Sequence, residues 1–548
     1  MRVPLLAWGE QRGERCQMDE HFDYVVIGAG SAGCVVACRL VKAGLKVALI
    51  EEGPTDKSLF VKMPGAFVRL IGTERSYLYH GEPQQELGGR APFVPQGRML
   101  GGGSSINAMI YVRGQPQDYD DWAKDGVTGW SWDEVLPAFL RAENNEVLAG
   151  PLHGTTGPLR VSDPRHRHPL SAAFVKAAQQ AGLPASRDFN GATQDGVGFY
   201  QTTTFDGKRG STAATYLASV LGRPNLRVLT GTRVRKLIVE GKQVKGVEVE
   251  TLKGGAVSNI MAGSEVILSA GALASPKILM LSGIGDPAEL TLAGVPVVHA
   301  LSGVGQNFQD HMEISVYGRT RQPISMAGQD KGLRALMHGL QYQMFQTGLL
   351  TSTVVESGGF VDTSGGGRPD VQFHVLPVLV GDADREPLPG HGISINPCYL
   401  RPASRGRVRL RSANFADPIL LEAGFLTARA DVDTLIRGVK LARTILRQPA
   451  LQAVVSEELL PSPKAEISDA EIEAHIRAYA KTVYHPSGTC KMGTDPMAVV
   501  DPTLRVHGMQ GLRVCDASIM PTLISGNTNA PTIMIAERCA EFILQSRQ

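Results

Sequence analysis

The chain has 548 residues, with 55 Lys and Arg against 53 Asp and Glu, which gives a net charge of +2. Such a length allows several domains and a large core, and the balanced charge excludes nucleic acid as an expected partner. No stretch approaches about 18 uninterrupted apolar residues, so no transmembrane segment is predicted. Seven cysteines without short-loop spacing favour free thiols in a reducing compartment. We therefore expect a cytoplasmic protein and leave open a peripheral association with the inner membrane.

The first regular pattern starts after residue 20, and we interpret residues 1–20 as an N-terminal extension. An apolar strand over 23–27 leads into a glycine-rich turn and then a helical pattern that ends at Gly44. This arrangement is typical of a turn that holds a pyrophosphate at a helix N-terminus. The residues that we expect to contact the cofactor in this turn are Gly28, Gly30, Ser31, Ala32 and Gly33. The alternative is an ordinary glycine turn in an α/β sheet.

A second apolar strand over 47–50 ends in Glu51. A carboxylate at the tip of this strand, about 20 residues past the glycines, accepts the ribose hydroxyls of an adenosine. The position of Glu51 therefore favours FAD or NAD over a 2′-phosphorylated cofactor, with Glu52 as the alternative acid. Cys34 and Cys38 lie one helical turn apart, but no second ligand pair accompanies them. We interpret them as core residues and predict no metal site.

A second unusual loop covers residues 95–110, where three glycines (101–103) precede two serines and an apolar helical start. A flexible linker is the alternative, but apolar residues on both sides argue against it. The two glycine-rich stretches together resemble the nucleotide fold and the first signature of the glucose-methanol-choline (GMC) oxidoreductases. Members of that family bind FAD here, some through a covalent bond to a histidine in this segment. No histidine lies between Arg98 and Gly114, so the resemblance implies non-covalent FAD.

The resemblance covers residues 21–545 and implies an α/β fold in which a Rossmann-like FAD-binding lobe is interleaved with a substrate lobe of an antiparallel sheet plus helices. We assign 21–167, 207–312 and 480–548 to the FAD-binding domain. We assign 168–206 and 313–479 to the substrate-binding domain, with helices expected around 429–446 and 469–480. The family's further cofactor contacts fall on Gly102, Asn107, Ala108, Met109, Val234, Ala270, Asp516 and Ala517.

The C-terminal part contains three family blocks in order, at 484–490, 514–518 and 526–537. Removing hydride from an alcohol carbon requires the hydroxyl proton to leave, and histidine is the side chain whose pKa suits a base near neutral pH. We therefore predict His485 as the catalytic base. Asn529 matches the His/Asn partner position of the family, where an amide would hold the substrate oxygen. His311, in another family block, is interpreted as structural.

The substrate side is predicted less directly. Tyr484 and Val483 are expected to line the cavity because they precede the base. Glu356 is an acid inside an apolar run and either faces the cavity or forms a salt bridge at a strand edge. Recognition of a quaternary ammonium group favours an aromatic cage, yet all four tryptophans precede residue 133 and none lies in the expected substrate lobe. We therefore expect a neutral alcohol as the substrate in preference to choline.

These observations predict an FAD-dependent enzyme that oxidises a primary or sugar-type alcohol to a carbonyl compound and passes the electrons to a quinone or another acceptor. The first alternatives are an oxygen-using alcohol oxidase and a choline dehydrogenase of the same family. A more distant alternative is a lyase that uses FAD only as a scaffold. The expected partners are therefore a small alcohol and an electron acceptor, and the chain is expected to be a monomer or homodimer.

Overall fold

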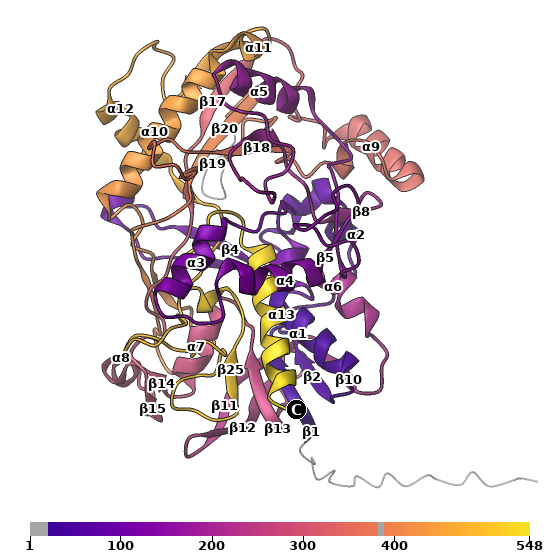
Figure 1. Cartoon of the computed structure of the whole chain (residues 1–548), viewed down its shortest axis with the longest axis vertical. Helices are drawn as coiled ribbons and strands as arrows, with labels where there is room; N and C mark the ends of the chain where they lie inside the picture. The colour runs from indigo at the N-terminus through magenta and orange to yellow at the C-terminus, as the bar shows by residue number, and fades with distance from the viewer. Residues whose placement is uncertain (1–19, 382–387, 548) are drawn as a thin grey trace, which may run out of the picture.

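The protein is described from a computed structural model, which covers residues 20–381 and 388–547. Apart from Glu20, the predicted extension over residues 1–20 lies outside the described residues. Two large sheets organise the chain, one in the lower and one in the upper half of the molecule in Figure 1. Within the described residues, no helix combines the length and the apolar character needed to cross a membrane.

The lower sheet has seven strands in the order β10-β2-β1-β13-β12-β11, with β25 beside β13. The neighbouring strands β10, β2, β1, β13 and β25 are parallel. β12 is antiparallel to both of its neighbours, β13 and β11. The bounds are β1 Glu20–Ile27, β2 Val47–Ile50, β10 Leu226–Leu229, β11 Thr232–Glu240, β12 Gln243–Thr251, β13 Val257–Leu268 and β25 Leu512–Val514. The four residues of β2 are at most 1% exposed, as expected of a parallel strand covered on both faces.

Two helices from opposite ends of the chain pack together on the lower sheet. α1 (Ser31–Lys42) follows the glycine turn, and α13 (Asn529–Gln545) lies against it, as the yellow and indigo ribbons in Figure 1 show. α4 (Trp132–Ala142) covers α13 in turn. The C-terminal family blocks are thereby brought to the first glycine turn, although about 500 residues of sequence separate Ser31 from Asn529.

The upper sheet has eight strands, all antiparallel, in the order β23-β17-β20-β19-β18-β7, with the short β16 and β24 at its edge. The bounds are β7 Gly196–Phe199, β16 Met312–Glu313, β17 Val316–Thr320, β18 Ser357–Val361, β19 Val371–Leu376, β20 Gly392–Tyr399, β23 Val455–Leu460 and β24 Lys481–Thr482. α5 (Pro169–Gln180) and α10 (Arg429–Leu446) pack on this sheet. The fold is thus the predicted combination of a Rossmann-like lobe and an antiparallel sheet covered by helices.

The remaining elements are short or peripheral. Five two-stranded ribbons are formed by β3 Ser76–His80 with β4 Phe93–Gly97, β5 Glu143–Asn145 with β6 Leu159–Val161, β8 Thr204–Phe205 with β9 Lys208–Arg209, β14 Ile284–Gly285 with β15 His299–Ala300, and β21 Arg407–Arg409 with β22 Leu420–Glu422. The other helices are α2 Leu59–Lys62, α3 Pro116–Lys124, α6 Thr212–Thr215, α7 Ala274–Leu281, α8 Pro287–Leu292, α9 Gly332–Phe345, α11 Pro449–Gln452 and α12 Asp469–Tyr479. Of these, α9 projects from the body of the molecule (Figure 1).

The division into two domains stays a prediction, but the sheets bear on it. β7 joins the upper sheet, as the assignment of 168–206 to the substrate lobe requires. β24 also belongs to the upper sheet through its pairing with β16, although we assigned residues 480–548 to the FAD-binding lobe. The chain therefore leaves the upper sheet immediately before His485 and rejoins the lower sheet only at β25.

Candidate active site

The glycine turn between β1 and α1 is closely packed. Gly28 has φ +90°, and a Cβ added there would lie 2.5 Å from the carbonyl oxygen of Ser269. A Cβ on Gly33 would lie 1.9 Å from the oxygen of Gly28. Only glycine fits at these positions, so β13 approaches the turn closely and α1 starts directly above β1. The first turn of a helix leaves N–H groups without intrahelical acceptors, and here Gly30 caps α1 without a side-chain bond, which suits an anionic phosphate.

Glu51 lies at this turn, as predicted. Its carboxylate oxygens accept hydrogen bonds from the backbone N–H of Ala29 at 3.0 Å and of Gly53 at 2.9 Å. Burial raises the pKa of Glu51 to about 7, and these two N–H groups oppose the rise. The alternative acid, Glu52, is instead paired with Arg98 at 3.1 Å and Arg233 at 3.0 Å. The geometry thus favours Glu51 for the ribose, and that role stays a prediction.

The second glycine loop covers the first one. A Cβ on Gly102 would approach the Cα of Gly30 to 2.7 Å, so the two loops are in backbone contact. Arg209, which is 3% exposed, donates to the Oδ1 of Asn107 at 2.8 Å and to its carbonyl oxygen at 2.7 Å. Met109 follows with φ 61°, in the left-handed region. Arg209, which we did not identify from the sequence, therefore fixes Asn107, the first of the predicted contacts Asn107, Ala108 and Met109.

The predicted cofactor contacts in the segments after β13 and β25 also lie near one another. Asp516, directly after β25, accepts from the N–H of Gly271 at 2.8 Å and from the Oγ of Ser275 at 2.6 Å. Asp516 thereby joins the turn that contains Ala270 to the segment that contains Ala517. The buried hydroxyl of Ser269 has no hydrogen-bond partner in the described structure. The close glycines, the helix N-terminus and this unpartnered hydroxyl fit a bound dinucleotide. Val234 lies buried on β11 in the same sheet.

His485 is held by a buried carboxylate and a second imidazole. Its backbone N–H donates to Asp310 Oδ1 at 2.8 Å, and its Nδ1 lies 3.0 Å from the Nδ1 of His311. His311 is fully buried, and its Nε2 lies 2.9 Å from the carbonyl oxygen of Leu400. His311 was predicted to be structural, whereas the structure places it in direct contact with the predicted base.

These contacts decide which nitrogen of His485 is basic. The carbonyl of Leu400 can only accept, so the Nε2 of His311 carries a hydrogen. Burial lowers the pKa of His311 to about 3, so its ring is neutral and its Nδ1 accepts. The Nδ1 of His485 must then donate across the 3.0 Å contact. In neutral His485 this leaves the lone pair on Nε2.

The charge state of His485 follows from its surroundings. Burial lowers its pKa well below the ordinary value, and the neighbouring imidazoles of His311 and His374 lower it further. No carboxylate oxygen lies in hydrogen-bond contact with its ring among the described contacts. The imidazole is therefore neutral near pH 7 and ready to accept a proton.

Asn527 is a neighbour of His485 that we did not identify from the sequence. The Nδ2 of Asn527 is 3.4 Å from the Nε2 of His485, and its Oδ1 accepts from Gln372 Nε2 at 3.0 Å. Asn529 starts α13, and its Oδ1 accepts from the Oγ of Ser31 at 2.9 Å, which ties the start of this helix to the glycine turn. The role predicted for Asn529 stays a prediction, and Asn527 is a second candidate for it.

Glu356 does not face a substrate cavity. It is fully buried, and its carboxylate accepts from the Nδ1 of His166 at 2.7 Å, the Oγ of Ser352 at 2.6 Å and the N–H of His168 at 2.6 Å. Burial alone would raise its pKa, but these donors hold it below the ordinary value. The contact with His166 agrees with the salt-bridge alternative, and Glu356 is an interior anion next to β18 that joins this strand to the segment before α5. For Tyr484 and Val483, both partly exposed, a substrate role stays a prediction.

The upper sheet supplies a polar surface that we did not identify from the sequence. Gln372 and His374 alternate on β19, and His374 is opposite Asn396 on β20. Glu313 accepts from the Nδ1 of His374 at 2.9 Å and from the Nδ2 of Asn396 at 3.0 Å. Their remaining atoms, Gln372 Oε1, His374 Nε2 and Asn396 Oδ1, are buried without partners in the described structure. Because Gln372 also contacts Asn527, the two amide oxygens offer acceptors close to the base.

Comparison with known proteins agrees with this geometry. The chain is 43% identical to an alcohol dehydrogenase [acceptor] of Pseudomonas putida over 96% of both chains. It is 44% identical to the mitochondrial choline dehydrogenase of Homo sapiens, with 96% of this chain and 90% of that protein covered. Among solved structures, pyridoxine 4-oxidase from Mesorbium loti matches with a TM-score of 0.86 and 33% identity, over 95% of this chain and 98% of that one.

Family models lead to the same result. The model of the N-terminal part of the GMC oxidoreductases matches residues 22–313, and that of the C-terminal part matches residues 402–536. Between them they contain the glycine turn, Glu51, the second glycine loop, His485 and Asn527. The chain belongs to the GMC oxidoreductase family.

Proposed function

We propose that this protein is an FAD-dependent alcohol dehydrogenase that oxidises a primary or sugar-type alcohol and passes the electrons to a quinone or another acceptor. The residues of the two glycine loops would hold FAD, which would supply the hydride acceptor. The observation that carries the proposal is the ordered hydrogen-bond chain from Leu400 through His311 to His485. That chain leaves the basic lone pair of His485 on Nε2, next to the amide of Asn527.

The chain's own residues perform the proton chemistry. The substrate hydroxyl would donate to the Nε2 of His485 while Asn527 Nδ2 donates to the same oxygen. As the proton moves to His485, negative charge grows on the oxygen, and the Asn527 donor stabilises it as an oxyanion-hole group does. Gln372 holds the Oδ1 of Asn527, which keeps the amide hydrogens directed at the site. Loss of the proton prepares the carbon to release hydride.

The substrate class is inferred from the polar surface on the upper sheet. Gln372 Oε1 and Asn396 Oδ1 offer acceptors, because they are amide oxygens whose amide nitrogens already donate to Asn527 and Glu313. Acceptors recognise hydroxyl hydrogens, so an alcohol with further hydroxyl groups fits this surface. A trimethylammonium group has no N–H to donate. The described tryptophans 122 and 130 are buried in the lower lobe, which again places choline second despite the similarity to choline dehydrogenases.

The first experiment is anaerobic reduction of the bound flavin by a panel of glycerol, a straight-chain diol, a 1-alkanol of equal length and choline. Rapid bleaching by a neutral alcohol supports the proposal. Absence of reduction by every alcohol would refute it and favour the lyase alternative. Reoxidation of the reduced enzyme with oxygen, compared with a soluble quinone analogue, then separates a dehydrogenase from an oxidase.

The binding mode of FAD is tested separately. No histidine occupies residues 98–114, so acid precipitation should release all flavin from the polypeptide, as absorbance of the supernatant would show. Glu51→Ala should lose FAD, because the ribose hydroxyls lose their acceptor, while enzyme refilled with FAD still turns over. Flavin that stays with the precipitate contradicts non-covalent binding, and unchanged flavin content in Glu51→Ala would indicate that another acid holds the ribose.

A further inference from the structure

Helix α9 has its apolar side turned outward. Leu333, Leu336, Met337, Leu340 and Met344 recur at helical spacing along one face, and Phe345 follows. Each of these six side chains is between 53% and 71% exposed. Among the residues of the helix, only Tyr342 is buried. A surface helix ordinarily presents such a stripe to the core, so the stripe of α9 is available to an external partner.

The segments beneath α9 extend the apolar surface. Tyr342 packs with Met63 and Ala66, and its hydroxyl donates to the carbonyl oxygen of Lys62 at 3.4 Å. On these same segments Leu59, Phe60 and Val68 are exposed. We call the exposed apolar side chains of α9 together with Leu59, Phe60 and Val68 the α9 patch. Contiguous exposed apolar surface of this kind marks an interaction site.

The charge around the α9 patch is mainly positive. Residues 57–70 and 331–352 contain the cations Lys57, Lys62, Arg69, Lys331 and Arg334, and neither stretch contains an Asp or a Glu. Of the acids that border these stretches, Asp330 is paired with Arg69 at 3.3 Å, Asp206 is paired with Arg165 at 3.6 Å, and Asp56 directly precedes Lys57. The whole chain carries only +2, so positive charge is concentrated around the α9 patch.

This charge distinguishes between two occupants. In a two-fold symmetric dimer the same patch is present on both subunits, so the cations around one α9 would lie against the cations around the other. An anionic lipid surface, in contrast, attracts Lys and Arg while the acyl region accepts the apolar stripe. We propose that the α9 patch docks this enzyme on an anionic lipid bilayer.

Docking would place the bilayer on the flavin side of the molecule. Arg209 donates to the carbonyl oxygen of Val61 in α2 at 3.0 Å and to that of Asn107 in the second glycine loop at 2.7 Å. The α2 segment therefore separates α9 from the loop expected to contact FAD. If the proposed function holds, a lipid-soluble electron acceptor in the bilayer has a short route to that loop. The docking itself does not depend on the alcohol dehydrogenase activity.

The test is co-sedimentation of the holoenzyme with vesicles of phosphatidylglycerol and phosphatidylethanolamine, compared with vesicles of phosphatidylcholine. Binding to the anionic vesicles is expected, and Leu336→Glu should weaken it at least tenfold, since a leucine that enters the bilayer on docking is replaced by a charge. The matched control is Leu292→Glu at the end of α8. This leucine is 74% exposed and does not belong to the patch. This control should bind as the wild type does.

A second pair of variants tests the charge. Lys331→Gln with Arg334→Gln should reduce binding by roughly fivefold per removed cation, whereas Lys242→Gln with Lys253→Gln, on the exposed turns of the lower lobe, should not.

Absence of vesicle binding by the wild type, or equal weakening by the control variants, overturns the proposal. So does a change from dimer to monomer caused by Leu336→Glu in ultracentrifugation without lipid, which would identify the patch as a subunit interface. Unchanged flavin reduction in solution by Leu336→Glu separates this test from that of the proposed function.

Discussion

Two histidines of this protein have opposite surroundings. The ring of His153 lies between two carboxylates, Glu143 Oε1 at 3.2 Å and Asp188 Oδ2 at 2.9 Å. Burial alone would lower its pKa, but the bonds to Asp188 and Glu143 outweigh burial and raise the pKa to about 9. His485 is also enclosed, yet its neighbours are imidazoles and an amide, and its pKa falls well below the ordinary value.

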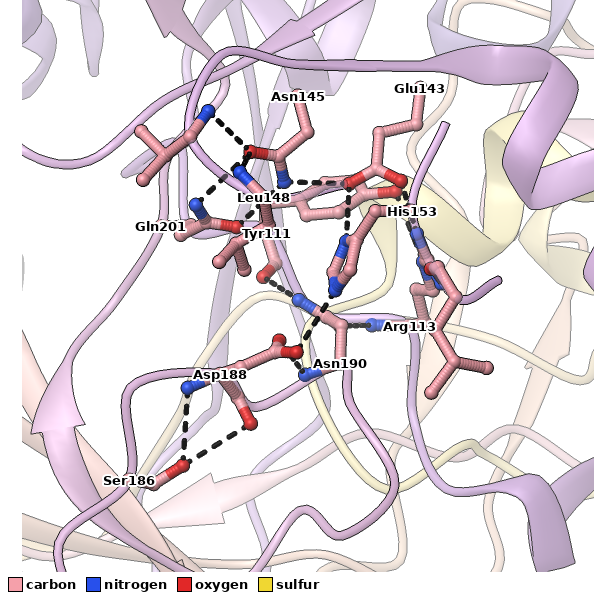
Figure 2. Close-up of polar contacts among 12 residues, drawn as sticks. Tyr111, Arg113, Glu143, Asn145, Leu148, His153, Ser186, Asp188, Asn190 and Gln201 are labelled. Carbon is pink, nitrogen blue, oxygen red and sulfur yellow. Dashed lines mark hydrogen bonds and ion pairs between the residues drawn. The ribbon is translucent and has the colours of Figure 1, made fainter. Parts of the chain in front are cut away.

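The network around His153 has the character of a structural clamp. Figure 2 shows Glu143 at its centre, in contact with the guanidinium of Arg113, the amide of Asn145 and the ring of His153. Arg113 and Glu143 are both fully buried. On the other side of the ring, Asp188 accepts from the N–H of Asn190, which in turn contacts the backbone of Tyr111 and Arg113. The network joins four separate segments of the chain.

The comparison shows that the partner, and not burial, decides the task of a buried histidine. A ring between carboxylates stays protonated near pH 7 and acts as a cation in an ion-pair network. A ring between an imidazole and an amide stays neutral and keeps a basic lone pair, as a proton acceptor must. The following substitutions test whether the two sites differ in this way, in order of expected effect.

The largest effect is expected from His485→Ala. Flavin reduction by the best alcohol should slow by roughly 10²–10⁴-fold, the usual contribution of a general base, while FAD content and the melting temperature stay close to those of the wild type. Anaerobic stopped-flow measurement of the reduction rate checks this. His153→Ala is the matched variant and should leave the rate of the folded enzyme nearly unchanged. Reduction at the wild-type rate by His485→Ala would mean that the base is elsewhere.

The clamp should instead affect stability. Glu143→Ala leaves the buried Arg113 and His153 without their shared carboxylate, and breaking such a pair costs about 3–5 kcal/mol. Thermal unfolding followed by intrinsic fluorescence should show a large fall in melting temperature, with the reduction rate of the remaining folded enzyme preserved. Glu146→Ala is the control, because the pair of Glu146 with Arg160 is exposed and such pairs contribute about 0–1 kcal/mol. Equal effects of the two variants would contradict the clamp.

Local patterns were sufficient for the parts of this fold that depend on neighbouring residues. The glycine turn and the position of Glu51 follow from one strand–turn–helix–strand unit, and α10 begins and ends at the predicted residues 429 and 446. Long-range partners could not be predicted in this way. Glu356 is an acid in an apolar run, but its donors His166 and Ser171 come from about 190 residues earlier. Nothing near Glu356 in sequence shows that it is already fully bonded.

The contacts of the two asparagines near α13 also depend on long-range packing. Residues 527 and 529 are both asparagine and differ in their place relative to the start of α13. Asn527 contacts His485 and Asn529 contacts Ser31, which lie 42 and 498 positions away in the sequence. The contact of His311 with His485 likewise spans 174 positions. In each case the residue type indicated a polar role, but the sequence did not show which side chain the residue would face.

Substitution of the two asparagines sharpens the comparison within the active site. Asn527→Ala should slow flavin reduction by about 3 kcal/mol, or roughly 10²-fold, because the oxygen loses the donor that stabilises its developing charge. Asn529→Ala should change FAD retention more than the reduction rate, since its partner is Ser31. The double variant His485→Ala with Asn527→Ala should be less than additive, because both groups act on one oxygen. A slow Asn529→Ala with a normal Asn527→Ala would identify Asn529, the residue predicted from the sequence, as the partner of His485.

The smallest effect is expected in the pH dependence of stability. Because the folded pKa of His153 is raised to about 9, from an unfolded value of about 6.5, its contribution is complete below about pH 6.5 and is lost as the pH rises through about 9. Between about pH 7.5 and 9.5 this amounts to about 2 kcal/mol. Thermal unfolding across that range should show a fall in melting temperature that is reduced in His153→Gln, which keeps polar contacts but cannot be protonated.

His485 should behave in the opposite way, which makes the pH experiment a direct test of the comparison. Its folded pKa is lowered, so its protonation destabilises the fold only as the pH falls below about 6.5, where the unfolded ring gains a proton and the folded one does not. For the same reason the rate of flavin reduction should be constant from about pH 6.5 upward, because the base is already neutral there. A reduction rate that rises with a pKa near 9 would place a protonated, carboxylate-paired histidine at the reacting oxygen, and the distinction between the two sites would fail.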